Sequence, residues 1–167
     1  MKKSAHHLLL LWDIRYQKIN TISFVGLLKI IEEDGFITEV YPVNESVISS
    51  EQTSELLKNA CKQLEEYFCG NRKSFDLPIK LHATAFEKQV WEQLKKIPYG
   101  QTRTYQEIAV AIGNEKAARA VGQANNKNRI IIIIPCHRVV NKNGTSGGFS
   151  YGTQMKNYLL NLEKCNK

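Results

Sequence analysis

Five consecutive isoleucines, residues 130–134, constrain the fold of this chain more than any other feature of its sequence. The run is too short for a typical helix, and its β-branched side chains suit a pleated strand. Pro135 ends the run because proline cannot continue backbone pairing. The sequence therefore predicts a strand buried on both faces, with Cys136 directly after it.

Cys136 is the candidate nucleophile. A cysteine at the break of a buried strand is held rigidly, and the neighbouring His137 and Arg138 are expected to favour the reactive thiolate. A histidine base needs a carboxylate behind it, and Glu163 is the only acidic residue after Glu115. The other three cysteines are expected to be ordinary structural thiols: Cys61, Cys69 and Cys165.

The cysteine spacing also bears on the compartment. The four cysteines form no Cys-x-x-Cys pair and no Cys/His pattern of a structural zinc site. Free thiols of this kind are typical of a reducing compartment, so the cytoplasm is expected. No apolar run approaches the roughly 18 residues that a membrane span needs, so membrane insertion is not expected.

Charge divides the chain into two unequal halves. Residues 1–84 carry 10 Lys/Arg and 11 Asp/Glu, a net charge of −1, whereas residues 85–167 carry 13 and 5, a net charge of +8. Positive charge concentrated in one half favours a polyanionic partner, with nucleic acid ahead of a membrane surface. A solvated basic surface with no partner is an equally good explanation of charge alone.

The N-terminal half has the pattern of a small sheet with one helix. Residues 8–11, 22–31 and 36–41 predict strands, and Glu33-Asp34-Gly35 supplies the turn of a hairpin. Apolar residues at helical spacing then predict a helix from Ser50 to Phe68. Ser49 or Ser50 is its expected cap, and Gly70 its expected end.

The polar segment Asn71 to Pro78 predicts a linker, close to the charge boundary. We therefore expect a structural N-terminal α/β domain, residues 1–79, and a second domain, residues 80–167, that holds Cys136 and most of the positive charge. The expected fold class is α+β.

The C-terminal half predicts helices separated by tight turns. Apolar spacing predicts one helix over residues 86–97, ended by Pro98, and another over 105–112, capped by Thr104. A third follows over 116–125 after a Gly-containing turn, the layout of a helix-turn-helix. Its alanines and glycine give it a slim profile suited to a narrow groove, or to tight packing in a core. Three cations flank it and favour DNA: Lys116, Arg119 and Lys127.

The segment Ile134-Pro135-Cys136-His137-Arg138-Val139-Val140 resembles the active-site signature of the O6-alkylguanine-DNA alkyltransferases, also called methylated-DNA–protein-cysteine methyltransferases. Residues 86–109 and 117–122 resemble the family's first DNA-binding segment and its recognition helix. The resemblance is nearly continuous over residues 80–165 and looser before them, where it rests on residues 33–35 and 75–78.

The resemblance implies an activity and a partner. Cys136 would accept an alkyl group irreversibly from O6-alkylguanine in double-stranded DNA, once per molecule, with O4-alkylthymine as a second candidate substrate. The target nucleotide would be flipped out of a duplex bound through its minor groove. The family's N-terminal domain is ribonuclease-H-like. A monomer without a cofactor is expected, cytoplasmic, or nuclear in a eukaryote.

The resemblance also implies residue roles. His137 would act on Cys136 through a water molecule, Glu163 would orient the imidazole, and Asn128 would tie the recognition helix to the active-site strand. No metal is expected, because the ligands of the family's N-terminal zinc site, which some members carry, have no match in this chain. The residues considered for it were His6, His7, Cys61 and Cys69.

A second set of roles concerns the DNA. Arg119 resembles the family's arginine finger, and Tyr105 resembles the tyrosine that turns the phosphate and contacts the base. Guanine-edge contacts are implied for the carbonyls of Cys136 and Val139 and for the amide of Ser150. Gln106 and Asn114 match DNA-contact positions, although ordinary polar surface residues would look the same.

Two other classes of protein share these features. A cysteine hydrolase would use Cys136 and His137 but needs turnover and an oxyanion site, and it leaves Arg119 unexplained. A helix-turn-helix module that only binds DNA or lesions explains the charge but leaves the cysteine without a role. Alkyl transfer accounts for both sets of residues.

The chain departs from the family pattern at two positions. Arg129 follows Asn128 where proline is common, which loosens a turn and adds a candidate phosphate contact. Tyr151 stands where many members carry glycine or tryptophan, and its side chain is expected to narrow the substrate site.

Because Tyr151 narrows that site, the free base O6-benzylguanine should react with this protein far more slowly than O6-methylguanine in DNA. Tyr151→Gly should raise the benzylguanine rate, measured as loss of active protein with time. Equal benzylguanine rates in the wild type and the variant would contradict this account of Tyr151.

Overall fold

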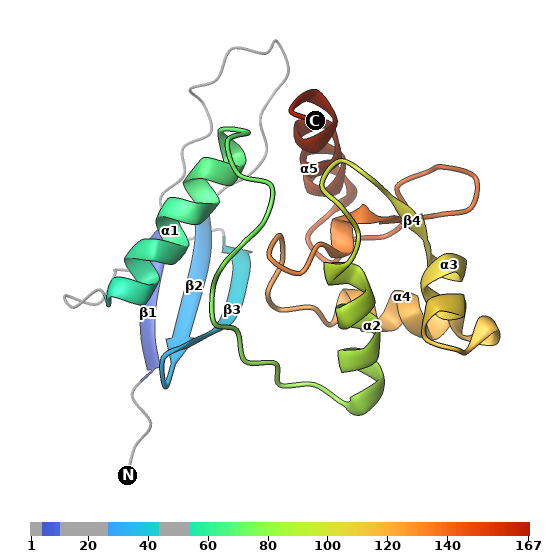
Figure 1. Ribbon diagram of the computed structural model, residues 1–167, viewed down its shortest axis with the longest axis horizontal. Helices are drawn as coiled ribbons and strands as arrows, with labels where there is room; N and C mark the ends of the chain where they lie inside the picture. The colour runs from blue at the N-terminus through green and yellow to red at the C-terminus, as the bar shows by residue number, and fades with distance from the viewer. Residues whose placement is uncertain (1–4, 11–26, 44–53) are drawn as a thin grey trace. The chain divides into compact units, whose positions relative to one another are not determined.

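The computed structural model describes residues 5–10, 27–43 and 54–167. The chain forms two compact units, Met1–Lys80 and Leu81–Lys167. The first contains a sheet and a helix, and the second is mostly helical (Figure 1). The α+β fold class expected from the sequence is therefore confirmed.

A three-stranded antiparallel sheet forms the base of the N-terminal unit. Its strands β1 (Ala5–Leu10), β2 (Leu27–Glu33) and β3 (Phe36–Val43) lie in the order β1-β2-β3. Asp34 and Gly35 join β2 to β3 with φ values of 54° and 79°, so both adopt the left-handed conformation that a two-residue hairpin turn requires. The predicted hairpin is confirmed. The parts of the predicted strands at residues 11 and 22–26 lie outside the described residues.

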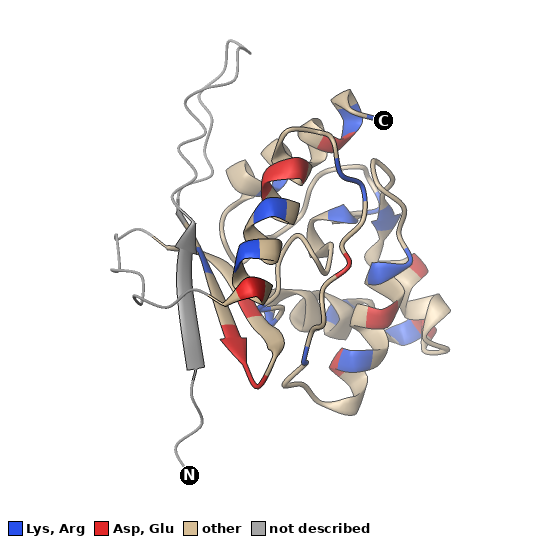
Figure 2. Ribbon diagram, turned by 60° about the vertical axis from the view of Figure 1, so that its left-hand side comes forward, with Lys and Arg blue, Asp and Glu red and all other residues tan. Residues whose placement is uncertain are grey.

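Helix α1 (Glu55–Phe68) packs on this sheet (Figure 1). Ser54 caps it: the Ser54 Oγ accepts from the amide of Leu57 at 3.1 Å and donates to the Glu32 carboxylate of β2. The caps predicted at residues 49 and 50 lie outside the described residues, and Ser54 takes that role. Along α1 two lysines lie between acidic residues at the two ends of the helix (Figure 2). Its buried apolar residues are Leu57, Ala60, Leu64, Tyr67 and Phe68.

The segment predicted as a linker is bonded to the N-terminal unit. The Gln63 side chain on α1 donates to the Asp76 carbonyl at 3.0 Å and accepts from its amide at 2.9 Å. Ile37 of β3 donates to the Pro78 carbonyl at 2.8 Å and accepts from the Lys80 amide at 3.0 Å. These bonds fix residues 76–80 to α1 and β3, so the segment is not a free linker.

Helices dominate the C-terminal unit. Helix α2 (Ala85–Lys95) and helix α3 (Tyr105–Ala111) each begin with a complete capping box, Thr84 with Glu87 and Thr104 with Glu107. A 3-10 turn, η2 (Glu115–Ala117), leads into α4 (Ala118–Asn126). The predicted pair of helices joined by a tight turn is therefore present as α3 and α4 (Figure 1).

Two polar contacts hold the end of α4 against α2. The Trp91 indole Nε1 donates to the Ala124 carbonyl at 2.9 Å, and Lys127 Nζ lies 2.7 Å from Glu87 Oε1. A short parallel pair, β4 (Arg103–Thr104) with β5 (Val139–Val140), joins the start of α3 to the segment that follows Cys136. Helix α5 (Thr153–Cys165) completes the unit. Within the part of the chain that the structure describes, no helix is long and apolar enough to cross a membrane.

Candidate active site

The isoleucine run is buried as expected, but it is not a strand. Residues 130–134 fold back on themselves in a tight turn, in which the Ile134 amide donates to the Ile130 carbonyl at 3.0 Å. Ile132 has a φ of 72°, a left-handed conformation that costs a β-branched residue about 1–3 kcal/mol. Burial of Ile132 to 1% exposure offsets this strain. The predicted strand is therefore wrong, while its predicted burial is right for all but the half-buried Ile133.

Asn128 explains why a turn replaces the strand. Its Oδ1 accepts from the Ile130 amide at 2.9 Å, and its Nδ2 donates to the Ile134 carbonyl at 2.9 Å. One side chain thus satisfies both ends of the turn, which would otherwise need a partner strand. The same Nδ2 lies 3.1 Å from the Cys136 Sγ, so Asn128 also fixes the sulfur.

Cys136 opens a single 3-10 turn, η3 (Cys136–Arg138), and is 3% exposed. Burial raises the pKa of its thiol to about 11, against the opposing effects of the Asn128 hydrogen bond and the Lys156 charge. The thiol is therefore protonated at rest at neutral pH. Of the two residues expected to favour the thiolate, His137 lowers the Cys136 pKa through a backbone hydrogen bond, but burial outweighs it, and the Arg138 charge is bound to Glu163.

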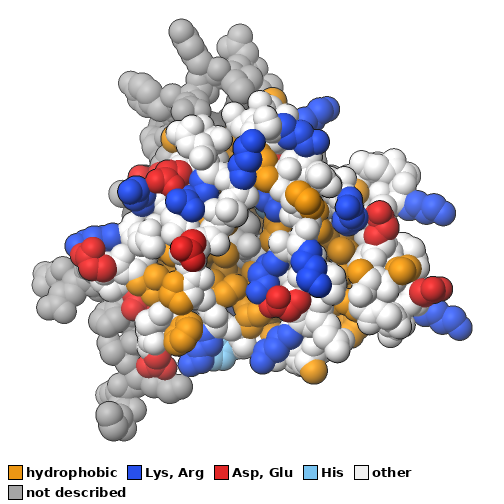
Figure 3. Space-filling model, viewed as in Figure 1, with side chains coloured by type: hydrophobic (Ala, Val, Ile, Leu, Met, Phe, Trp, Pro, Cys, Tyr) orange, Lys and Arg blue, Asp and Glu red, His pale blue; other side chains and the backbone are white. Residues whose placement is uncertain are grey.

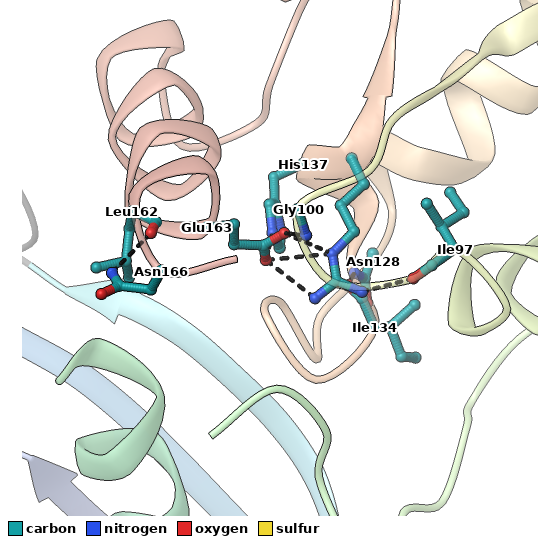
Figure 4. Close-up of polar contacts among 9 residues, drawn as sticks. Ile97, Gly100, Asn128, Ile134, His137, Leu162, Glu163 and Asn166 are labelled. Carbon is teal, nitrogen blue, oxygen red and sulfur yellow. Dashed lines mark hydrogen bonds and ion pairs between the residues drawn. The ribbon is translucent and has the colours of Figure 1, made fainter. Parts of the chain in front are cut away.

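Glu163 on α5 is the centre of a buried polar network (Figure 4). Its Oε1 lies 2.7 Å from His137 Nε2, and its two oxygens accept from Arg138 Nε and Nη2, each in a bond of 2.9 Å. The Gly100 amide donates to Oε2 at 2.9 Å. Arg138 Nη1 also donates to the Ile97 carbonyl at 2.6 Å. One carboxylate thereby joins α5, η3 and the loop after α2.

The hydrogen bonds of this network determine the protonation states of Glu163 and His137. Burial raises the pKa of Glu163, but the hydrogen bonds from His137 and Arg138 and the charge of Arg138 outweigh it and bring that pKa to about 2. An ionised carboxylate only accepts, so the His137 Nε2 must carry the proton. Burial lowers the pKa of His137 despite the opposing effect of Glu163. The ring is therefore neutral at pH 7, with its lone pair on Nδ1, and is able to act as a base.

Lys156 is a site residue that the sequence reasoning missed. It is fully buried on α5, and its Nζ donates to the carbonyls of Val139 at 2.6 Å and Gly148 at 3.3 Å. Burial lowers the pKa of Lys156 to about 8, and a thiolate at Cys136 would oppose that shift. The sequence does contain a signal for this position. Lys156 and Glu163 are seven residues apart, which places both side chains on one face of a helix.

Tyr105 lies beside these groups at the start of α3. Burial and the nearby Cys136 raise the pKa of its phenol, and the Lys156 Nζ lies 5.8 Å from the centre of its ring. A methyl group on Gly122 of α4 would lie 3.7 Å from the ring, and one on Gly147 would lie 3.2 Å from the hydroxyl. Gly147 therefore leaves room for the tyrosine hydroxyl, whereas the distance at Gly122 is an ordinary van der Waals contact.

The remaining predicted residues, apart from the buried Val139, lie at or near the surface. Arg119, Gln106 and Asn114 are exposed, and the Gln106 side chain donates to the Glu115 carbonyl at 2.8 Å, which ties α3 to η2. Ser150 Oγ donates to the Asn126 carbonyl at 2.8 Å. Tyr151 is half-buried and packs edge-on against Phe149, with ring centres 5.9 Å apart. Val139, expected to read guanine through its carbonyl, already accepts from Lys156 there.

The other cysteines differ from the expectation of buried thiols. Cys69 and Cys165 are exposed, and Cys61 is only half-buried, with burial raising its pKa to about 12. Cys69 and Cys165 fall at the C-terminal ends of α1 and α5, where the chain leaves the packed face. Cys136 alone combines burial with a polar network. Among the described residues, no group of His, Cys, Asp and Glu is arranged to hold a metal ion.

On the face of the C-terminal unit that Figure 3 shows, the basic side chains are dispersed. In Figure 3 they lie over α2 and around the turn between α3 and α4, with acidic side chains among them. Lys116 and Arg119 are exposed beside that turn, whereas Lys127 is engaged with Glu87. Lys116 and Arg119 are therefore exposed cations at or just before the start of α4 for which the structure shows no ion pair among the described residues.

Two family models together match almost the whole chain. Residues 85–165 match the DNA-binding domain of 6-O-methylguanine DNA methyltransferase, and residues 14–81 match the ribonuclease-like domain of the same proteins.

Individual relatives agree with both models. A methylated-DNA–protein-cysteine methyltransferase of Methanosarcina acetivorans is 54% identical over 112 residues, which are 67% of this chain and 72% of the relative. The constitutive enzyme of Bacillus subtilis is 42% identical over 149 residues, 84% of this chain and 90% of the relative. The crystal structure of Mycobacterium tuberculosis OGT in complex with DNA has a TM-score of 0.76 at 39% identity, and the match covers 85% of this chain and 89% of that one. The chain therefore belongs to the methylated-DNA–protein-cysteine methyltransferase family.

Proposed function

We propose that this protein repairs O6-alkylguanine in double-stranded DNA by moving the alkyl group onto the sulfur of Cys136. Its membership of the methyltransferase family and its likeness to a relative crystallised with DNA support this function. The observation that carries it is the cluster around the thiol, in which Asn128 holds Sγ and the adjacent His137 is bonded to Glu163. Such a cluster positions a thiol and places a base near it that removes its proton when the substrate reacts.

The proton of the thiol moves to His137. The imidazole is neutral and its Nε2 is committed to Glu163, so Nδ1 takes the proton through a bridging water molecule. The Glu163 carboxylate then stabilises the imidazolium. Lys156, whose charge opposes the rise in the Cys136 pKa, favours the thiolate as it forms.

The transfer is a displacement at carbon. The Cys136 sulfur forms a bond to the alkyl carbon while the bond from that carbon to O6 breaks, and guanine leaves with the electron pair. Tyr105 supplies a proton to the departing ring, since its raised pKa keeps the phenol protonated. A thioether is not cleaved by the same site, so each molecule acts once.

DNA binding falls to the C-terminal unit. Helix α4 presents Arg119 beside the small residues Ala118, Ala120 and Gly122, which lets it approach the floor of the minor groove. A buried thiol can reach a base in a duplex only after the nucleotide has been flipped out, and Arg119 fills the gap that the nucleotide leaves. Residues 80–167 then carry recognition and chemistry, and residues 1–79 are structural. A reducing compartment such as the cytoplasm suits a free acceptor thiol.

The proposed function is tested by incubating the protein with a duplex that contains one O6-methylguanine, followed by intact mass and a tryptic map. We expect a gain of one methylene mass on Cys136 that saturates at one equivalent, and none in Cys136→Ala. The exposed Cys69 and Cys165 are internal controls and should stay unmodified. Turnover beyond one equivalent would favour a hydrolase, and bound lesion with unmodified Cys136 would favour a binding module.

Arg119→Ala tests the role of α4 in extruding the base. We expect its transfer rate on duplex O6-methylguanine to fall about 10- to 100-fold, because unstacking costs a few kcal/mol that the arginine offsets. Its rate on the same strand without a complement should change less than about 3-fold, since extrusion from a duplex is not needed.

Lys116→Ala is the matched control for Arg119→Ala, because it removes an exposed cation from the turn before α4. The affinity for duplex should fall, and binding should depend less on salt concentration. The transfer rate at saturating duplex should be unchanged. An equal loss for Arg119→Ala on single-stranded and duplex substrates would rule out the extrusion role.

A further inference from the structure

Asn125 on α4 is a buried amide with no evident structural task. It is 7% exposed, and neither its Oδ1 nor its Nδ2 has a hydrogen-bond partner among the described residues. Folded proteins pair most of their buried polar atoms, because leaving one unpaired sacrifices its bonds to water. A leucine would fill this position in a helix without that cost. A polar residue kept here therefore indicates a partner outside the protein chain.

The helical spacing shows which way Asn125 faces. Gly122, three residues earlier, lies against the ring of Tyr105, and Asn128, three residues later, lies 3.1 Å from the Cys136 sulfur. The Asn128 amide donates to the Asn125 carbonyl at 3.1 Å, so the helical path continues between them. Residues three apart share a helix face. Asn125 therefore lies on the stretch of α4 that runs from Tyr105 to Cys136.

Two other polar side chains near the sulfur are already engaged within the protein. Asn128 is bonded to the turn and to the sulfur, and Lys156 is bonded to the carbonyls of Val139 and Gly148. Asn125 keeps a donor and an acceptor together, which a planar amide can present to the edge of a nucleobase. Purine edges offer both ring-nitrogen acceptors and, in guanine, a 2-amino donor.

We propose that Asn125 hydrogen-bonds the edge of the extruded O6-alkylated purine and so helps to select the base. This inference rests on the proposed function, because it requires a base to enter the space between Tyr105 and Cys136. Asn125 pairs its amide only when substrate is bound. Its contribution should therefore appear in substrate selection and not in the stability of the free protein.

Asn125→Leu tests the inference, because it keeps the size of the side chain and removes its polar atoms. Single-turnover transfer is measured at saturating duplex with O6-methylguanine, and with O6-methylated purines that each lack one edge group: the 2-amino group, N1, N3 or N7. We expect about a 10- to 100-fold loss on O6-methylguanine. The loss should shrink to below about 3-fold on the analogue that lacks the contacted group.

The Tm of the free protein separates recognition from a structural role. Removal of an unpaired buried amide should leave Tm unchanged or raise it, while the transfer rate falls. Gln123→Leu makes the same change at an exposed position of α4 and should leave the saturated rate and the analogue pattern unchanged. If Asn125→Leu fails to fold, Asn125→Ala is tested on the same panel.

Three results would overturn the inference: an unchanged rate on O6-methylguanine, an equal loss on all of the purines, or a loss accompanied by a lower Tm. The wild-type protein is measured first on O6-methylguanine. Absence of transfer to its Cys136 would refute the proposed function itself, whereas normal wild-type transfer with an unaltered Asn125→Leu would refute only the role of Asn125.

Discussion

The buried carboxylate of Glu163 is the contact on which the C-terminal unit depends. It accepts hydrogen bonds from His137, Arg138 and Gly100, and so joins the last helix to the cysteine segment and to the loop after α2. A buried carboxylate is tolerated only when its charge is balanced and its oxygens are bonded, and Arg138 meets both needs through a two-bond contact. Loss of Glu163 would leave Arg138 charged and buried, with the imidazole unanchored.

The same burial that demands this network keeps Cys136 unreactive until substrate arrives. A thiol with a pKa of about 11 is almost wholly protonated at pH 7, so it is protected from stray electrophiles and oxidants. The base, His137, has no direct hydrogen bond to the thiol among those the structure shows. Its ring is neutral, and its Nε2 faces Glu163. Reactivity is therefore gained by proton transfer in the loaded site, while Asn128 holds the sulfur in place throughout.

Local signals in the sequence predicted the local structure well. The capping box at Thr104 and the hairpin at Asp34-Gly35 depend on neighbouring residues, so their sequence patterns were sufficient. The strand predicted for the isoleucine run is wrong because the side-chain hydrogen bonds of Asn128 favour a turn there. The periodicity of apolar residues carries no information on those bonds.

The candidate site was predictable in its residue types and less so in its electrostatics. Glu163 could be named as the partner of His137 because acidic residues are scarce near the C-terminus. Lys156 was overlooked because lysine is almost never fully buried, although its spacing from Glu163 placed it on the same face. The protonation state of Cys136 depends on burial by segments remote in sequence, which composition cannot supply.

The central claim, that the resting thiol is protonated and gains reactivity only with substrate, is tested most directly by the pH dependence of Cys136 alkylation with iodoacetamide. The DNA-free protein is followed by peptide mapping, with an unstructured cysteine peptide, of pKa about 8.5, as the reference. Because only the thiolate reacts, the rate at Cys136 should keep rising well above pH 9. A plateau reached below pH 8 would show a thiolate at rest and contradict the account.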